Sequence, residues 1–432
     1  MARKKKIRQR TGAEALLSIE KLAAAYDLPP PHLHVSDPIQ DDDAFKRGLR
    51  GEYNLYSRVA GQPDVDNLEQ WICNFEGAAK CRVFASGMAA VTAALAAAAE
   101  IKGPIHIIVL LPVYGGTYMW LRKLTRSASH NILVTFLQAN DPNLRFKLSD
   151  AIGPATRAIF FEMAGNPTLT MPDVEGIVHI AHKCVRDIMV ICDTTFLYGL
   201  FQPFKWGIDI AVASDTKYFV GESSWLMGHC SVSKAFFERC PRFWQELMEY
   251  STELGAVLGP IEAWLTYNFC LPTLMERIRQ QSHNALAIAY FLEQHFLVER
   301  VTYPGLGSYP QRANALKYLE TIDGKKYHGG MVAFYLKNAD FQRTMRFLYH
   351  LNNNSQIMHK ASLGGSVYSV ESPAGLSHAT CDAVDNFQSD IKNNLVRFSS
   401  GRIVADFGDG NPLPELSTIM DALDEALAAV NS

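Results

Sequence analysis

Two neighbouring stretches, IMVICDTTF (residues 188–196) and IDIAVASDTK (residues 208–217), decide the fold of this chain. Each begins as an almost continuous apolar run and ends in polar residues, without the alternation of a half-exposed strand. Strands buried on both faces of a largely parallel sheet have this pattern. We therefore expect an α/β layer, with ligands bound outside the carboxyl ends of its strands, where Asp193 and Lys217 stand.

Five further apolar runs are predicted to be strands of the same layer. They are CRVFAS (81–86), IHIIVLLP (105–112), ILVTFL (132–137), AIFFEM (158–163) and HCSVSK (229–234). Helix-like segments at residues 87–100 and 174–184 separate several of them, as expected when crossover helices join parallel strands. The sequence therefore predicts a seven-stranded, mostly parallel sheet in a domain spanning residues 66–260.

The chain on either side of this layer has a different character. Residues 1–65 carry few strand signals and a triple proline, so we expect an extended N-terminal arm. Beyond Pro260 a long helical pattern begins. Two strand-like runs and a closing amphipathic helix follow, at residues 329–336, 395–400 and 413–430. This order predicts a smaller α+β domain over residues 261–432.

Composition excludes several classes of protein. The chain has 432 residues, of which 48% are hydrophobic and 20% charged, which is typical of soluble globular proteins of two or three domains. A net charge of −3 gives no overall attraction to nucleic acid or to anionic membranes. The longest apolar runs are shorter than the roughly 20 residues of a membrane-spanning helix. We expect no nucleic-acid or membrane partner.

The eight cysteines form no CxxC pair, which excludes zinc-ribbon and thioredoxin motifs, and no metal site is expected. Several lie in apolar segments, as buried free thiols do in a reducing compartment, and this favours a cytoplasmic location. The start of the chain, MARKKKIRQR, carries six basic residues and no uninterrupted apolar core. It is interpreted as a solvated tail, with targeting or anion binding as the alternative.

Polar residues at the strand ends could carry chemistry. An ionised Asp193 can hold the proton on a pyridine nitrogen, and the amine of Lys217 can form an imine with an aldehyde, which are the two groups that pyridoxal phosphate requires. Ser214 and Thr216 add hydroxyl donors for a phosphate. Gly87 starts an Ala-rich helix, whose N-terminus favours an anion. Taken singly, each cluster has an ordinary explanation as a cap, a turn or a solvated side chain.

Taken together and in order, these motifs resemble the Cys/Met metabolism (trans-sulfuration) family of pyridoxal-phosphate enzymes, which includes cystathionine γ-synthase and cystathionine γ-lyase. The matching segments are YSR (56–58), LEQWICNFEGA (68–78), SGMAA (86–90), YGGTY (114–118), GNPT (165–168), DTTF (193–196), SDTKY (214–218), YPGL (303–306), GGM (329–331), SLGG (362–365) and VRFSSG (396–401). The resemblance covers nearly the whole chain beyond residue 50. It implies the pyridoxal-phosphate transferase fold of type I.

The resemblance also implies roles for individual residues around the cofactor. Lys217 is expected to hold pyridoxal phosphate as a Schiff base and later to move protons on the substrate, and Asp193 is expected to pair with the ring nitrogen. The phosphate is expected to be bound by the backbone N–H groups of Gly87 and Met88 and by the hydroxyls of Ser214 and Thr216. Asn166 is expected to form a hydrogen bond with the phenolic oxygen of the ring.

Further expected roles concern the substrate and the neighbouring subunit. Tyr114 is expected to stack on the ring and exchange protons with the leaving group. Arg397 is expected to bind the substrate carboxylate, with Ser362 beside it. Tyr56 and Arg58 resemble a pair that reaches the phosphate of a neighbouring subunit, which implies a homodimer with shared sites and a homotetramer built from two dimers.

The sequence departs from the family pattern at Asp215, where the family generally has a small or neutral residue, at Glu222 and at Val367. We expect these changes to lie where the substrate side chain binds, and to leave cofactor binding intact. The resulting hypothesis is γ-elimination or γ-replacement on a sulfur- or oxygen-substituted amino acid of the cystathionine or homoserine-ester type. The alternatives are β-elimination, as in a cystathionine β-lyase, and a cofactor-binding protein with remodelled or lost activity.

Overall fold

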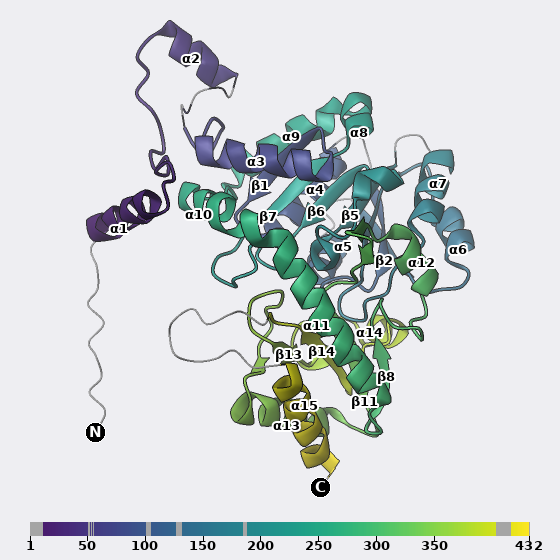
Figure 1. Ribbon diagram of the computed structural model, residues 1–432. Coiled ribbons are helices and arrows are strands. Elements are labelled where there is room, and N and C mark those ends of the chain that lie inside the picture. Colours follow the sequence, from purple (N-terminus) through teal and green to yellow (C-terminus); the bar gives the residue numbers. More distant parts are fainter. Residues whose placement is uncertain are drawn as a thin grey trace.

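The computed structural model describes residues 12–50, 52, 54, 56–100, 105–126, 132–184, 188–402 and 416–431 (Figure 1). The basic start of the chain lies outside these residues. Within them the chain forms two main sheets, with helices around each and an arm at the N-terminal end.

The first sheet has seven strands and confirms the predicted layer. They are β1 (Lys80–Phe84), β2 (Ile105–Leu111), β3 (Ile132–Gln138), β4 (Thr156–Glu162), β5 (Met189–Asp193), β6 (Ile210–Ala213) and β7 (Gly228–Val232). They lie in the order β1-β7-β6-β5-β4-β2-β3. Strand β7 runs antiparallel to both β1 and β6, and the four other pairings are parallel.

Both faces of this sheet are buried, which is why its strands are apolar throughout. Along β2, Ile108 and Leu110 belong to one hydrophobic cluster, whereas Ile107 and Val109 belong to another on the opposite face. The first cluster includes residues of α3 (Pro63–Glu76), α6 (Leu144–Ala151) and α7 (Val174–Cys184). The second includes residues of α4 (Gly87–Glu100), α5 (Gly115–Arg126), α8 (Lys234–Arg239) and α9 (Pro241–Glu253). The sheet is therefore the middle layer of an α/β/α sandwich.

The second sheet confirms the expected α+β character of the C-terminal part. Its strands are β8 (Val298–Thr302), β11 (Met331–Leu336), β12 (Met358–His359), β13 (Ser369–Glu371) and β14 (Leu395–Ser399), in the order β12-β13-β14-β11-β8. The helices of this part are α10 (Pro260–Leu265), α11 (Leu274–Gln294), α12 (Arg312–Tyr318), α13 (Phe341–Asn354), α14 (Ala383–Gln388) and α15 (Leu416–Asn431), and a two-stranded ribbon joins β9 (Thr321–Ile322) to β10 (Lys325–Lys326). The long helix α11 runs from the first sheet toward the second (Figure 1).

The N-terminal arm differs from the extended segment that we expected, because it contains two helices, α1 (Gly12–Ala25) and α2 (Asp42–Leu49). The sequence of α1, GAEALLSIEKLAAA, is rich in strong helix formers. Helix α2 is capped by Asp41, whose side chain accepts a hydrogen bond from Ala44 N. Helix α2 stands away from the rest of the molecule, whereas the end of α1 lies near α10 (Figure 1). There Trp264 Nε1 donates to Pro29 O at 2.9 Å, and Ala23 of α1 is buried. None of the described helices is both long and apolar enough to cross a membrane.

Candidate active site

The carboxyl ends of β4, β5 and β6 open onto a cavity of about 630 Å³. Pairing in register places Glu162 beside Asp193 at the ends of β4 and β5. Of the twelve residues to which the resemblance assigns roles, ten line this cavity: Gly87, Met88, Tyr114, Asn166, Asp193, Ser214, Thr216, Lys217, Ser362 and Arg397. Residues far apart in the sequence are thus brought together where the strand pattern predicted a ligand.

The start of α4 forms one wall of the cavity. A Cβ atom on Gly87 would lie 2.4 Å from Ser214 Cβ, so no larger residue fits between the helix and the β6 end. This close approach exposes a helix N-terminus beside a serine hydroxyl, which suits a phosphate group. The hydroxyl of Thr216 donates to Met227 O (3.1 Å) and accepts from Met227 N (2.8 Å). Its expected contact with a phosphate stays a prediction.

Asp193 is held by its neighbour Thr195. The backbone N–H of Thr195 donates to Asp193 Oδ1 (2.8 Å), and Thr195 Oγ1 accepts from Ser214 N (2.8 Å). Burial raises the pKa of Asp193 to about 6, although the hydrogen bonds from Thr195 act against this shift. The carboxylate is therefore ionised at neutral pH, as pairing with a protonated ring nitrogen requires.

Lys217 has the properties of a nucleophilic amine. Burial, and then the positive charge of Arg397, lower the pKa of Lys217 to about 8. A substantial fraction of the amine is then neutral near pH 8 and able to attack a carbonyl carbon. Its Nζ atom lies 3.5 Å from Ser362 Oγ.

Arg397 reaches the cavity from strand β14 of the second sheet. Its guanidinium donates to Asn166 Oδ1 (2.8 Å) and to Ala361 O (3.0 Å). Glu371 Oε2 lies 3.1 Å from Arg397 Nη2, and both side chains are buried. Because Asn166 uses its oxygen to accept from Arg397, its amide N–H₂ group is the part that can donate to a ligand. The arrangement places a fixed positive charge beside Lys217.

Three supporting residues received no role from the sequence. Glu162 accepts hydrogen bonds from Tyr114 N (2.6 Å) and Asn166 N (2.7 Å), and so it ties two cavity residues together. Burial and the charge of Asp193 raise the pKa of Glu162 well above its usual range. Its position at a strand end was the available signal. For Thr195 the signal was its place in the DTTF motif, two residues after Asp193. Glu371 carried no comparable signal, because its partner Arg397 is set by tertiary packing.

Tyr56 and Arg58 do not line the cavity of their own chain. Both are exposed on the arm; the guanidinium carbon of Arg58 lies 5.3 Å from the Tyr56 ring centroid, and Arg58 Nη1 donates to Thr252 O at 2.6 Å. Their expected contact with a neighbouring subunit stays a prediction.

The expectation that the unusual residues face the substrate is wrong, because none of the three lines the cavity. Asp215 is only 1% exposed and bonds to His229 inside the protein, on the far side of the backbone from the cavity lining. Glu222 pairs with Arg402 outside the cavity. Ser214 and Thr216 line the cavity, whereas Asp215, at the start of the turn that follows β6, points toward His229. Val367 is also absent from the lining.

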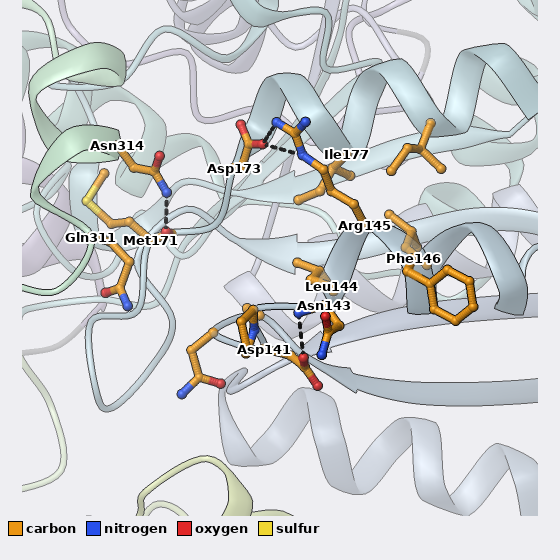
Figure 2. A pocket seen from close by; sticks show the side chains of 15 residues that line it. Asp141, Asn143, Leu144, Arg145, Phe146, Met171, Asp173, Ile177, Gln311 and Asn314 are labelled. Carbon is orange, nitrogen blue, oxygen red and sulfur yellow. Dashed lines mark hydrogen bonds and ion pairs between the residues drawn. The ribbon is translucent and has the colours of Figure 1, made fainter.

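A second hollow, of about 450 Å³, lies beside α6 and α7 (Figure 2). Its polar side chains are largely paired with one another or with backbone. Arg145 Nε donates to Asp173 Oδ2 at 3.0 Å, and Asn314 Nδ2 donates to Met171 O at 2.9 Å. It contains no lysine among its lining residues. The site at the strand ends is therefore the one that fits pyridoxal phosphate, because it combines the Gly87 cradle, the carboxylate of Asp193 and the amine of Lys217.

Comparisons with known proteins agree with this assignment. A family model for Cys/Met metabolism PLP-dependent enzymes matches residues 29–407. Cystathionine gamma-lyase of Bos taurus is 34% identical over 400 residues, covering 92% of this chain and 89% of the relative. Cystathionine beta-lyase of Lactococcus lactis subsp. cremoris is 32% identical over 372 residues, which cover 85% of this chain and 90% of the relative.

A solved structure extends the similarity to three dimensions. Cystathionine gamma synthase from Xanthomonas oryzae pv. oryzae, determined in complex with aminoacrylate and cysteine, matches with a TM-score of 0.79 and 25% identity over 98% of this chain and 99% of the other. The sheet order, the cavity and the match to most of the sequence lead to one conclusion. This chain belongs to the family of Cys/Met metabolism PLP-dependent enzymes.

Proposed function

We propose that this enzyme catalyses γ-elimination or γ-replacement on an amino acid with a sulfur or oxygen substituent, of the cystathionine or homoserine-ester type. The observation that carries the proposal is the convergence of Lys217, Asp193 and Arg397 in one cavity. An amine, an ionised carboxylate and a guanidinium are what this chemistry needs. The similarity to cystathionine gamma-lyases supports the choice of substrate class.

Pyridoxal phosphate, when bound, supplies an aldehyde that captures amines and a ring that accepts electrons from carbon. The backbone N–H groups of Gly87 and Met88 and the hydroxyl of Ser214 bind its phosphate at the start of α4. Asp193 holds the proton on the ring nitrogen. Asn166 donates its amide to the phenolic oxygen.

The substrate is oriented and deprotonated by the remaining cavity residues. Arg397 binds the substrate carboxylate through a charge-assisted pair, with Ser362 beside it. Lys217 removes the proton from Cα and then moves a proton at Cβ, which a leaving group on Cγ requires. Tyr114, which is exposed at the cavity, donates a proton to the departing sulfur or oxygen.

The complete site includes a second copy of the chain. Tyr56 and Arg58 lie outside their own cavity, and they supply the phosphate of a neighbouring subunit with a hydroxyl and a positive charge. The functional unit is accordingly a homodimer with shared sites, assembled further into a homotetramer. Its free, mostly buried cysteines suit a cytoplasmic location.

Product analysis tests the proposed reaction. The purified enzyme is loaded with pyridoxal phosphate and given cystathionine, O-acyl-homoserines, methionine and cysteine in turn, with Lys217→Ala as control. We expect a 2-oxobutanoate-type acid from cystathionine, or a replacement product when a second nucleophile is present, and at least a roughly 10³-fold loss in the control. Pyruvate from cystathionine would instead establish β-elimination. No product from the whole panel by a protein that binds the cofactor would overturn the enzymatic proposal.

A further inference from the structure

A buried charge cluster lies directly behind the cofactor site. It consists of Glu76 near the end of α3, His229 on β7 and Asp215 in the segment that follows β6. These residues are 6%, 0% and 1% exposed. Charged groups are rarely buried this deeply unless they are paired, so their hydrogen bonds define the protonation of the cluster.

The geometry fits a doubly protonated imidazole. His229 Nδ1 lies 2.8 and 2.9 Å from the two carboxylate oxygens of Asp215, and His229 Nε2 lies 3.1 Å from Glu76 Oε1. Ionised carboxylates only accept hydrogen bonds, so with Asp215 and Glu76 ionised both ring nitrogens donate. The hydroxyl of Ser231, two residues along β7, donates to the other oxygen of Glu76. The charges of Asp215 and Glu76 outweigh burial and raise the pKa of His229 well above its usual range.

The cluster is connected to the cofactor site through the backbone. Asp215 stands between Ser214 and Thr216, two residues before Lys217, so its bond to His229 anchors the segment that carries the reactive amine. On the other side, Ser214 N donates to Thr195 Oγ1, and Thr195 N donates to Asp193 Oδ1. A continuous chain of short contacts therefore runs from Glu76 to Asp193.

We propose that His229 is a positioning residue for the cofactor: its imidazolium, held between Glu76 and Asp215, anchors the Ser214–Lys217 segment and favours the ionised form of Asp193 toward the ring nitrogen. The charged groups that face this imidazolium are Glu76 from α3, Asp215 after β6 and, farther away, Asp193 on β5. The rings of Tyr198 and Phe219 pack on it, with centroids 5.6 and 6.4 Å away.

Neighbouring charges determine in which direction each substitution should shift the pKa of Asp193. Burial raises the pKa of Asp193, the hydrogen bonds from Thr195 lower it, the charge of His229 also lowers it, and the charge of Asp215 raises it. Removal of the imidazolium alone should therefore shift the shared proton from the ring nitrogen toward Asp193. Removal of Asp215 together with His229 takes away both opposing charges, so the proton should return toward the ring. If the cluster had only a structural role, removing Asp215 in addition to His229 would not reverse the effect of removing His229 alone.

The test reads the proton on the cofactor directly. Holoenzyme is prepared with pyridoxal phosphate labelled with ¹⁵N in the ring, and the ring ¹⁵N chemical shift is recorded at pH 7.5 (about neutral) for the native protein and its variants. In His229→Gln we expect the shift to move toward that of unprotonated pyridine, and in Asp215→Asn/His229→Gln to move back toward the native value. A ring ¹⁵N chemical shift in His229→Gln equal to that of the native protein would overturn the proposal.

Two comparisons separate this effect from a loss of folding. If His229→Gln does not fold, Asp215→Asn is compared with Asp215→Asn/His229→Gln, which differ only at His229, and identical shifts would overturn the proposal. The matched control is His182→Gln, since His182 also pairs with a buried carboxylate, Asp209, at 3.1 Å but lies away from the cavity. It should leave the ring shift unchanged. The inference rests on the proposed cofactor role of Asp193 but not on the substrate. If the product assay fails while the ring ¹⁵N shifts of the variants change as expected, only the proposed reaction is contradicted.

Discussion

Arg397 Nη1 donates a 2.8 Å hydrogen bond to Asn166 Oδ1, and this bond joins the second sheet to the segment that follows β4 of the first. The residue assigned to the substrate carboxylate is thereby held against the residue assigned to the cofactor ring. In the proposed function, the orientation of the substrate relative to the cofactor therefore depends on both sheets.

Replacement of Arg397 by lysine should weaken substrate binding more than turnover. Lysine cannot reproduce the bond to Asn166, the bond to Ala361 and a forked contact with a carboxylate at the same time. We expect KM to rise by about 10- to 100-fold, as for the loss of a charge-assisted hydrogen bond. Steady-state kinetics of Arg397→Lys measure this, with the exposed Arg300→Lys as control. An unchanged KM would remove Arg397 from the substrate site.

Replacement of Glu162 by glutamine should disturb the site although Glu162 has no proposed contact with substrate. The two oxygens of the Glu162 carboxyl group accept hydrogen bonds from Tyr114 N and Asn166 N, and the amide nitrogen of glutamine would face one of these two N–H groups. A buried donor without an acceptor costs about 1–3 kcal/mol. Thermal unfolding and kcat of Glu162→Gln should both fall, kcat by roughly 10-fold or more. The exposed Glu175→Gln is the control, and native values in both assays would contradict the role of Glu162.

The buried amine of Lys217 should destabilise the cofactor-free protein in a pH-dependent way. Its pKa is about 8 in the folded state and 10.5 in the reference state, so between these values the unfolded chain binds more protons and stability rises with pH. Lys217→Met removes the penalty, so at pH 7 the variant should be more stable by about 1–3 kcal/mol. Urea unfolding of both cofactor-free proteins measures the difference, which should fade as the pH approaches 10.5. A variant less stable at neutral pH would contradict the lowered pKa.

Sites shared between subunits should show complementation. Arg58→Ala and Lys217→Ala are each expected to be nearly inactive, because every site lacks one required group. Coexpression gives hybrid dimers in which one site takes Lys217 from one chain and Arg58 from the other, so about a quarter of native activity should return. Activity measurements on the purified mixture test this. No recovery, with hybrids present by mass, would place Arg58 outside the neighbouring site.

The sequence could predict the sheet and most of the cavity because the relevant signals are local. Apolar runs ending in Glu162, Asp193 and Lys217 place polar groups at adjacent strand ends in a parallel sheet. The extended arm is a wrong prediction, because an absence of strand signals does not by itself indicate extended structure, and the composition of α1 favours a helix.

The buried cluster could not be predicted from the sequence. His229 is 14 residues from Asp215 and 153 residues from Glu76, and only the packing of α3 against the sheet brings the three together. Asp215 therefore looked like a change in the substrate pocket. Its side chain in fact faces the core, because the turn after β6 directs it toward His229.

The central claim is that Lys217 carries the cofactor. The most direct measurement is reduction of the holoenzyme with borohydride, which fixes an imine as a stable amine, followed by peptide mass spectrometry. The account predicts one pyridoxyl phosphate group per chain, on the peptide containing Lys217. Label on another lysine, or no label after incubation with pyridoxal phosphate, would contradict it.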